Sequence, residues 1–212
     1  IKVVDAMGNA TVFEYDEAGN RIAEIDANEN TVRYEYDKLG RKTKRILALG
    51  MSESFVYNNL GNIIEHKNFN GDVIKYEYDD NKELVKKVFE DGTSESYTYT
   101  GTGQPKSIKY SRGETLFQYD LRDRLIKQTE PDNLSIEYEY DKAGNRTAIK
   151  TSIGTVKYSY DELNRLLKVV DSNGAITEYT YDAVGNRIGI KYPNSTETQY
   201  KYDSLNRLLS VV

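Results

Sequence analysis

The chain has 212 residues, of which 38% are hydrophobic and 30% charged, with a formal net charge of −5 and no cysteine. The absence of cysteine excludes disulfide bonds and thiolate metal sites, and an acidic chain with scattered Lys and Arg argues against nucleic acid as a partner. No apolar run approaches the roughly 20 residues that cross a bilayer, so no transmembrane segment is predicted.

The first well-defined element is a strand over residues 11–16. Thr11, Phe13 and Tyr15 alternate with Val12 and Glu14. Alternation with a period of two among β-branched and aromatic residues is typical of a β-strand. We therefore expect both rings on one face of a sheet and mainly polar side chains on the other.

A tight turn is predicted directly after this strand. Asp16 and Gly19 occupy the first and fourth positions expected of a type I turn. The Asp carboxylate can accept hydrogen bonds from backbone N–H groups of its own turn, and the Gly can adopt the positive φ that completes a bulged hairpin loop. A second strand, over residues 21–25, should follow.

A second turn then closes each repeat, as at Gly8, Asn70-Gly71 and Asn173-Gly174. Asn-Gly is among the strongest short-range signals for a β-hairpin. We therefore interpret each repeat as two strands with tight connections on both sides. The copies that end at Tyr119 and Tyr160 are one residue short, and we place the loss at the mouth of this second turn.

The strand and first turn recur ten times at intervals of 20 or 21 residues. The residues of this structural repeat motif are Tyr15, Asp16, Gly19, Tyr36, Asp37, Gly40, Tyr57, Gly61, Tyr78, Asp79, Tyr99, Gly103, Tyr119, Asp120, Tyr140, Asp141, Gly144, Tyr160, Asp161, Tyr181, Asp182, Gly185, Tyr202 and Asp203. Asp123, Asn164 and Asn206 replace the Gly in three copies. In the copy with Lys82, we expect Asn81 to take the left-handed conformation.

These repeats predict an all-β fold of about twenty antiparallel strands. A sheet of that length must curl, because open twisted sheets rarely exceed about 10 strands. We expect residues 1–212 to form one repeat array that is a piece of a longer protein. Exposed first and last strands would favour edge-to-edge self-association.

The motif rings allow two interpretations. They can stack on the rings of the next hairpin, which is worth about 0.2–1 kcal/mol per cross-strand pair. Alternatively, they can form a platform for sugars or for an apolar cargo segment. We favour stacking, since a ring that packs against its neighbour has little face left for a ligand.

No catalytic, metal or cofactor site is predicted. The single histidine, His66, has no cysteine near it and is interpreted as a surface strand residue. The motif aspartates occur about once per repeat, as a structural element would and a unique catalytic pair would not. No calcium loop or glycine-rich phosphate loop is present, so we expect a non-enzymatic protein.

Several copies closely resemble the YD repeats of the RHS/YD-repeat family, namely YDEAGNR (15–21), YDKLGRK (36–42), YDKAGNR (140–146), YDELNRL (160–166), YDAVGNR (181–187) and YDSLNRL (202–208). This family includes bacterial Rhs toxins, the B and C components of ABC toxin complexes, wall-associated proteins and teneurins. The resemblance covers essentially the whole chain and implies a spiralling β-sheet that builds a hollow shell.

In bacterial members the shell encloses a C-terminal toxic domain. The resemblance thus implies two features: a wall role beside the rest of the parent shell and its enclosed effector, and a secreted or cell-surface location. The alternative to a wall role is a carbohydrate- or cell-surface-binding module. The shell-closing segment and its aspartyl self-cleavage site are not found in residues 1–212, so encapsulation would belong to the parent protein.

Overall fold

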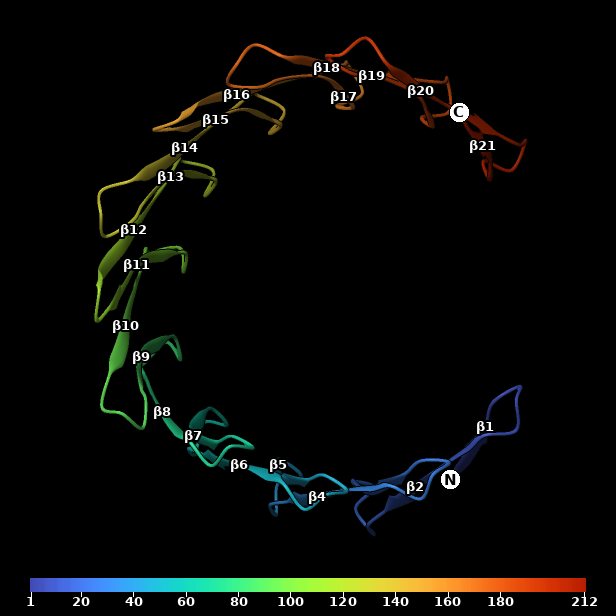
Figure 1. The fold of residues 1–212 in the computed structure, drawn as a ribbon. Helices are drawn as coiled ribbons and strands as arrows, with labels where there is room; N and C mark the ends of the chain where they lie inside the picture. The colour runs from blue at the N-terminus through green and yellow to red at the C-terminus, as the bar shows by residue number, and fades with distance from the viewer. The chain divides into compact units, whose positions relative to one another are not determined.

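The computed structural model describes residues 1–212 and consists of antiparallel β-strands joined by turns, without a helix (Figure 1). The predicted all-β fold is confirmed, with twenty-one strands against the expected twenty. The strands are β1 (Lys2–Val4), β2 (Ala10–Tyr15), β3 (Arg21–Ile25), β4 (Thr31–Tyr36), β5 (Lys42–Ile46), β6 (Ser52–Tyr57), β7 (Ile63–Lys67), β8 (Val73–Tyr78), β9 (Leu84–Val88), β10 (Ser94–Tyr99), β11 (Pro105–Tyr110), β12 (Gly113–Tyr119), β13 (Leu125–Thr129), β14 (Ser135–Tyr140), β15 (Arg146–Thr151), β16 (Gly154–Tyr160), β17 (Leu166–Val170), β18 (Ile176–Tyr181), β19 (Arg187–Lys191), β20 (Glu197–Tyr202) and β21 (Leu208–Val211).

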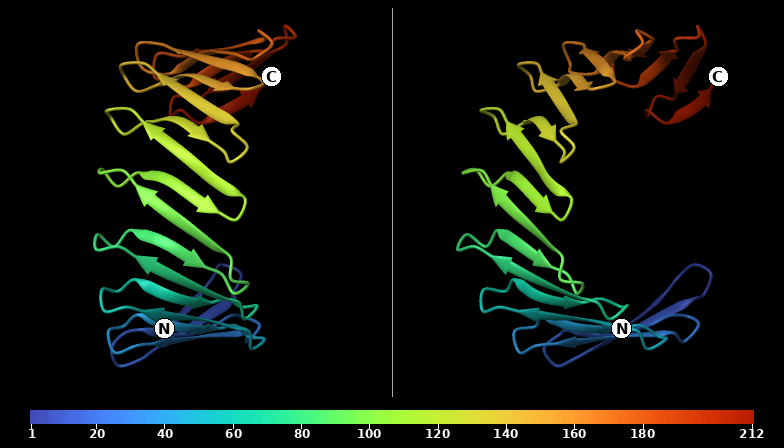
Figure 2. Two further views of the ribbon diagram at one scale, coloured as in Figure 1. Left: turned by 90° about the vertical axis from the view of Figure 1, so that its left-hand side faces the viewer. Right: turned by 60° about the vertical axis from the view of Figure 1, so that its left-hand side comes forward.

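The chain divides into two units. Unit 1 comprises Ile1–Thr98 and Ile108–Ser111, and unit 2 comprises Tyr99–Ser107 and Arg112–Val212. In unit 1, each strand from β1 to β10 pairs with the next along the chain. The strands from β12 to β21 do the same in unit 2. Within each unit the strands lie side by side in chain order, with turns along both margins (Figure 2).

The register places both rings of each motif on one face. In the β4–β5 hairpin, Tyr34 lies opposite Arg45, and the register shifts by a β-bulge between Glu35 and Tyr36. The same shift at the motif tyrosine occurs in the other hairpins of this kind. We refer to the face that carries the two rings of each motif as the tyrosine face.

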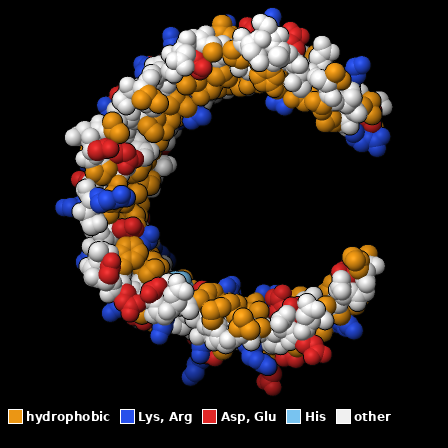
Figure 3. All heavy atoms as spheres, in the orientation of Figure 1, with side chains coloured by type: hydrophobic (Ala, Val, Ile, Leu, Met, Phe, Trp, Pro, Cys, Tyr) orange, Lys and Arg blue, Asp and Glu red, His pale blue; other side chains and the backbone are white.

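Each unit is a thin sheet with little interior. The buried hydrophobic residues are Ala23, Ala148 and Ile190. The face opposite the rings carries cross-strand ion pairs such as Lys127–Glu137, whose charged atoms are 2.8 Å apart. Exposed pairs of this kind add little stability. Hydrophobic side chains gather in a band along one face of unit 2 (Figure 3). Because so few residues are buried, stability must come mainly from contacts between neighbouring hairpins.

Two turn details differ from expectation. Lys82 itself adopts the left-handed conformation, with φ of 67°, so the assignment to Asn81 is wrong. The backbone N–H of Lys82 donates to the Asp79 carbonyl at 3.0 Å, which fixes the fourth turn position whatever residue occupies it. Glu29, which the sequence did not single out, adopts the same conformation with φ of 65°. Its position, 21 residues from Gly8 and Gly50, is the signal that could have found it.

The short repeats are shortened at the second turn, as predicted. Thr151 lies opposite Gly154, which leaves a loop of only Ser152 and Ile153. Full-length repeats instead close this turn with a backbone bond across four positions, as from Asp26 N–H to the Asn30 carbonyl at 3.0 Å. The missing residue is therefore a loop residue, and the strands keep their register at the rings.

Candidate functional site: the repeated tyrosine-aspartate turn

The aspartate of each motif organises its own turn. Asp161 Oδ1 accepts hydrogen bonds from the backbone N–H groups of Leu163 and Arg165, both at 2.9 Å. The backbone closes the same turn, because Asn164 N–H donates to the Asp161 carbonyl at 3.0 Å and Asp161 N–H to the Arg165 carbonyl at 2.9 Å. These bonds are those of a type I turn followed by a left-handed residue.

The residue four positions after the aspartate completes the turn. Arg124 Nε donates to Asp120 Oδ2 at 2.7 Å, and its Nη2 lies 2.6 Å from the same oxygen. Arg41 binds Asp37 in the same manner, and Arg165 Nε donates to Asp161 Oδ2 at 2.6 Å. Such two-pronged, charge-assisted contacts hold a guanidinium in one orientation.

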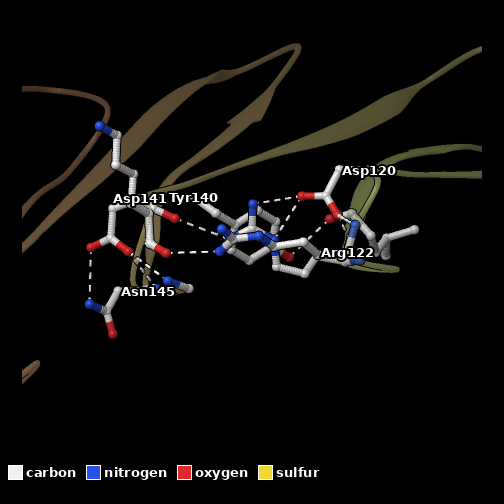
Figure 4. A network of polar contacts seen from close by, with 9 residues as sticks. Asp120, Arg122, Tyr140, Asp141 and Asn145 are labelled. Atoms are coloured by element: carbon white, nitrogen blue, oxygen red, sulfur yellow. Dashed lines mark hydrogen bonds and ion pairs between the residues drawn. The ribbon is translucent and has the colours of Figure 1, made fainter.

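That fixed guanidinium reaches into the next repeat. Nη1 donates to a backbone carbonyl 17 residues further on, from Arg41 to Asn58 at 3.0 Å, from Arg124 to Asp141 at 3.1 Å and from Arg165 to Asp182 at 3.1 Å. The guanidinium carbon lies 4.7, 4.6 and 4.7 Å from the ring centres of Tyr57, Tyr140 and Tyr181. We refer to this arrangement as the arginine interlock, and Figure 4 shows its surroundings at Asp120, Tyr140 and Asp141.

The hydroxyl of the motif tyrosine also contacts the preceding hairpin. It donates to the backbone carbonyl of the residue that starts the preceding strand, as from Tyr140 to Leu125 at 2.9 Å and from Tyr57 to Lys42 at 2.7 Å. Six further motif tyrosines do the same, namely Tyr36, Tyr78, Tyr119, Tyr160, Tyr181 and Tyr202. Each of these rings is thereby tied to the hairpin before it at its hydroxyl, and Tyr57, Tyr140 and Tyr181 are tied at the ring face as well.

The expectation that motif rings stack on one another is wrong. The stacked ring pair is Phe55 with His66, whose centres are 4.7 Å apart and whose planes differ by 5°. Over the rings of Tyr34, Tyr97 and Tyr200, an Arg or Lys side chain from a neighbouring strand lies on the ring instead. His66 is half-buried, with Nε2 3.3 Å from Glu53 Oε2.

Asparagine replaces the arginine in four repeats, and in three of them its shorter side chain donates to the aspartate of its own turn. Asn145 Nδ2 donates to Asp141 Oδ2 at 3.0 Å and to Asn164 Oδ1 of the next turn at 2.7 Å. Our sequence interpretation missed the role of this position. The signal was present, since Asn or Arg stands four residues after the aspartate position in eight of ten copies.

Hydrogen bonding lowers the pKa of motif carboxyl groups such as those of Asp37 and Asp141. The Arg41 side chain is the main cause for Asp37, and the Asn145 side chain is the main cause for Asp141. Burial of the hydroxyl has the opposite effect on tyrosine and raises the pKa of Tyr57, Tyr78 and Tyr160. Both shifts favour the protonation states that make the bonds described above.

These shifts predict how stability depends on pH. A lowered carboxyl pKa contributes stability that is present above the unfolded value of 3.8 and is lost as pH falls through the folded value. A raised tyrosine pKa contributes stability that is present below 10.0 and is lost at higher pH. We therefore expect a plateau in melting temperature between about pH 5 and 9, with a decline on either side. Thermal melts from pH 2.5 to 11 test this, and a decline that begins near pH 6 would contradict the assignment to carboxylates.

The hydroxyl contact can be tested separately. Tyr140→Phe should lower the free energy of unfolding by about 1 kcal/mol, because it leaves the Leu125 carbonyl without its donor. Tyr138→Phe is the matched control, since the Tyr138 hydroxyl makes no hydrogen bond within the structure. Urea unfolding of both variants checks the prediction, and equal losses would show that the hydroxyl contact contributes nothing.

The surface has few features of a metal-binding or ligand-binding site. No three acidic, histidine or cysteine side chains come together as metal ligands would. One hollow of 430 Å³ lies between β19 and β20 and is lined by residues such as Gly189, Ile190 and Tyr200. No helix in the structure could span a membrane. The repeated turn is thus the feature that the chain presents most consistently.

Two family profiles match the chain. The RHS Repeat profile matches residues 1–31, 15–52, 160–197 and 181–212. The Teneurin YD-shell profile matches residues 48–146. Together they leave only residues 147–159 unmatched. No curated protein matches the chain.

Solved toxin structures share the fold. The crystal structure of TcdB2-TccC3-TEV matches with a TM-score of 0.78 at 18% identity, over 100% of this chain and 13% of that one. The Tc holotoxin pore of Photorhabdus luminescens matches with a TM-score of 0.64 at 17% identity, over 96% of this chain and 13% of the other. The chain therefore spans about an eighth of these relatives. By these profile matches, the chain belongs to the RHS/YD-repeat family.

Proposed function

We propose that residues 1–212 are a non-enzymatic part of the wall of a YD-repeat shell. In the complete protein, this wall would enclose a C-terminal toxin or effector domain. The profile matches and the shared fold support a shell role. Enclosure of an effector is a proposal by analogy with the toxin relatives, as is a secreted location.

The observation that carries the proposal is the arginine interlock. At three junctions, those of Arg41, Arg124 and Arg165, one hairpin contacts the next through the backbone carbonyl, ring face and hydroxyl of the motif. At other junctions the tyrosine hydroxyl alone makes this contact, as from Tyr78 to Ile63, so the motif residues are committed to joining hairpins. A sheet held in this way can be thin and still continuous, which a wall requires and a catalytic pocket does not. We therefore assign the tyrosines, aspartates and glycines of the motif a structural role.

Binding of carbohydrate is the alternative. It needs exposed ring faces on which a sugar can stack. The faces of Tyr57, Tyr140 and Tyr181 are instead covered by arginine. This geometry favours the wall over the sugar platform, and a glycan array would test the alternative directly.

Limited proteolysis of the complete protein that contains residues 1–212 tests whether these residues form part of an enclosing wall. We expect its C-terminal domain to resist protease in the unaltered protein and to be cleaved faster when Asp161→Ala and Arg165→Ala are combined, because these changes remove one interlock. Lys168→Ala is the matched control, since it removes only an exposed ion pair to Glu178 with 3.7 Å between the charged atoms. A C-terminal domain cleaved equally fast in all three proteins would overturn the proposal, as would a complete protein without such a domain.

A further inference from the structure

The tyrosine face of unit 2 is apolar along the middle of its strands. Residues directly opposite each other in an antiparallel pair share a face. From β14 to β19 the register places aromatic and aliphatic side chains on this face, namely Tyr138, Ile149, Val156, Val169, Tyr179 and Ile190. Arg146 and Arg187 reach the rings of Tyr138 and Tyr200 from the first residues of β15 and β19. Between those strand ends, the face carries no charged side chain.

The opposite face of unit 2 is charged. Lys168 Nζ lies 3.7 Å from Glu178 Oε1, and Lys150 pairs with Glu139. These residues belong to the same strands as the aliphatic side chains and alternate with them, so they point away from the tyrosine face. Unit 2 therefore has one face suited to water and one that is not.

Unit 1 shows that an apolar tyrosine face is not a requirement of the repeat. There Arg45 Nε lies 3.1 Å from Glu53 Oε1, and Lys87 Nζ lies 3.5 Å from Glu95 Oε2. Arg45 and Lys87 stand opposite motif rings, so both ion pairs lie on the tyrosine face. The same positions can thus hold charges without loss of the hairpins, and their replacement by Ile149, Val169 and Ile190 is a property of unit 2 alone.

The apolar face of unit 2 is partly accessible. Leu167 and Ile188 extend it and are 38% and 39% exposed, while Ile149, Val156 and Val169 are half-buried. Figure 3 shows hydrophobic side chains along the concave side of unit 2. Contiguous exposed apolar surface of this kind marks a site of interaction.

We propose that the tyrosine face of unit 2 is the inner face of the wall and binds uncharged, apolar segments of the enclosed polypeptide. This inference rests on the proposed function. An enclosing wall turns its concave side inward and its other side toward bulk water, where the Lys–Glu pairs stay hydrated. A face without charges cannot compensate a charged segment for its lost hydration, so it selects apolar ones.

Cysteine labelling of the complete protein that contains residues 1–212 tests which face is inside. Leu167 and Lys168 are neighbours in β17 with side chains on opposite faces, and they are 38% and 37% exposed. A maleimide on a long polyethylene glycol chain should modify Lys168→Cys readily. It should modify Leu167→Cys at least about tenfold more slowly, because access to an inner face requires the wall to open. Peptide mapping locates the label.

The same two variants of residues 1–212 alone are the control. Both cysteines should then react at similar rates, because nothing is enclosed. Equal rates in the complete protein, with its C-terminal domain still protected from protease, would overturn the inner-face assignment and leave the proposed wall intact. Slow labelling of Leu167→Cys in residues 1–212 alone would also overturn it, since a second copy would then cover the face. A C-terminal domain without protection removes the wall and this inference with it.

Photo-crosslinking tests the partner. The photoreactive residue p-benzoylphenylalanine in place of Leu167 should cross-link to apolar segments of the C-terminal domain, and in place of Lys168 it should not. Val85 is the matched position in unit 1, beside the Lys87–Glu95 pair, and should give fewer cross-links. Cross-links from position 167 that are absent, that reach only charged segments, or that are no more frequent than those from position 85 would overturn the binding of apolar segments.

Discussion

Replacing Gly154 with alanine is expected to lower the free energy of unfolding by about 3 kcal/mol, the largest loss that we predict for a single methyl group. Gly154 has φ of +144°, a conformation that L side chains rarely adopt. A Cβ placed there would approach the Cβ of Ser172 in the neighbouring loop to less than 3.0 Å. The backbone strain and the clash both arise because the two-residue loop brings this backbone directly against the next turn.

Two companion variants separate these costs. Gly174→Ala should lose only about 1–2 kcal/mol, because Gly174 has φ of +83° but nothing within 4 Å of the added Cβ. Ser172→Gly should restore part of the stability when combined with Gly154→Ala, since it removes the atom that clashes. Urea unfolding at several wavelengths measures the three changes, and equal losses at Gly154 and Gly174 would show that the clash is relieved by movement of the loop.

Replacing Asn58 with aspartate is expected to raise the free energy of unfolding by about 1–2 kcal/mol. The side-chain nitrogen of Asn62 is buried and has no hydrogen-bond partner. In the equivalent turn, Asn20 Nδ2 donates to Asp16 Oδ2 at 2.8 Å. Asn58 offers its one side-chain oxygen to the backbone N–H groups of Leu60 and Asn62 and has no second oxygen to offer. Aspartate supplies that oxygen, and its charge also lies near Arg41.

The matched control is the same change at Asn68. Asn68 Nδ2 donates to Asp72 Oδ2 at 3.0 Å, so Asn68→Asp places two carboxylates side by side and should destabilise the protein. Thermal melts at pH 7 compare the two variants. A lower melting temperature for Asn58→Asp would mean that Asn62 already has a partner in solution.

The sequence by itself determined the local structure of each repeat. Alternation around Phe13 and Tyr15 specified a strand with both rings on one face, and the Asp16-to-Gly19 spacing specified the turn, because both depend on residues within a few positions of one another. The prediction from sequence also failed at one local detail. A lysine gives no sign that it will adopt a left-handed conformation, yet Lys82 does so because the turn around Asp79 is fixed by backbone bonds.

The tertiary structure alone decided how one repeat holds the next. Arg124 binds Asp120 four residues away, but the carbonyl that it reaches belongs to Asp141, and the ring that it covers belongs to Tyr140. Those partners meet only after the intervening hairpin has formed, so spacing within one repeat could not distinguish a ring stacked on a ring from a ring covered by arginine. The closeness of Gly154 to Ser172 has the same origin, because it depends on how two neighbouring turns pack.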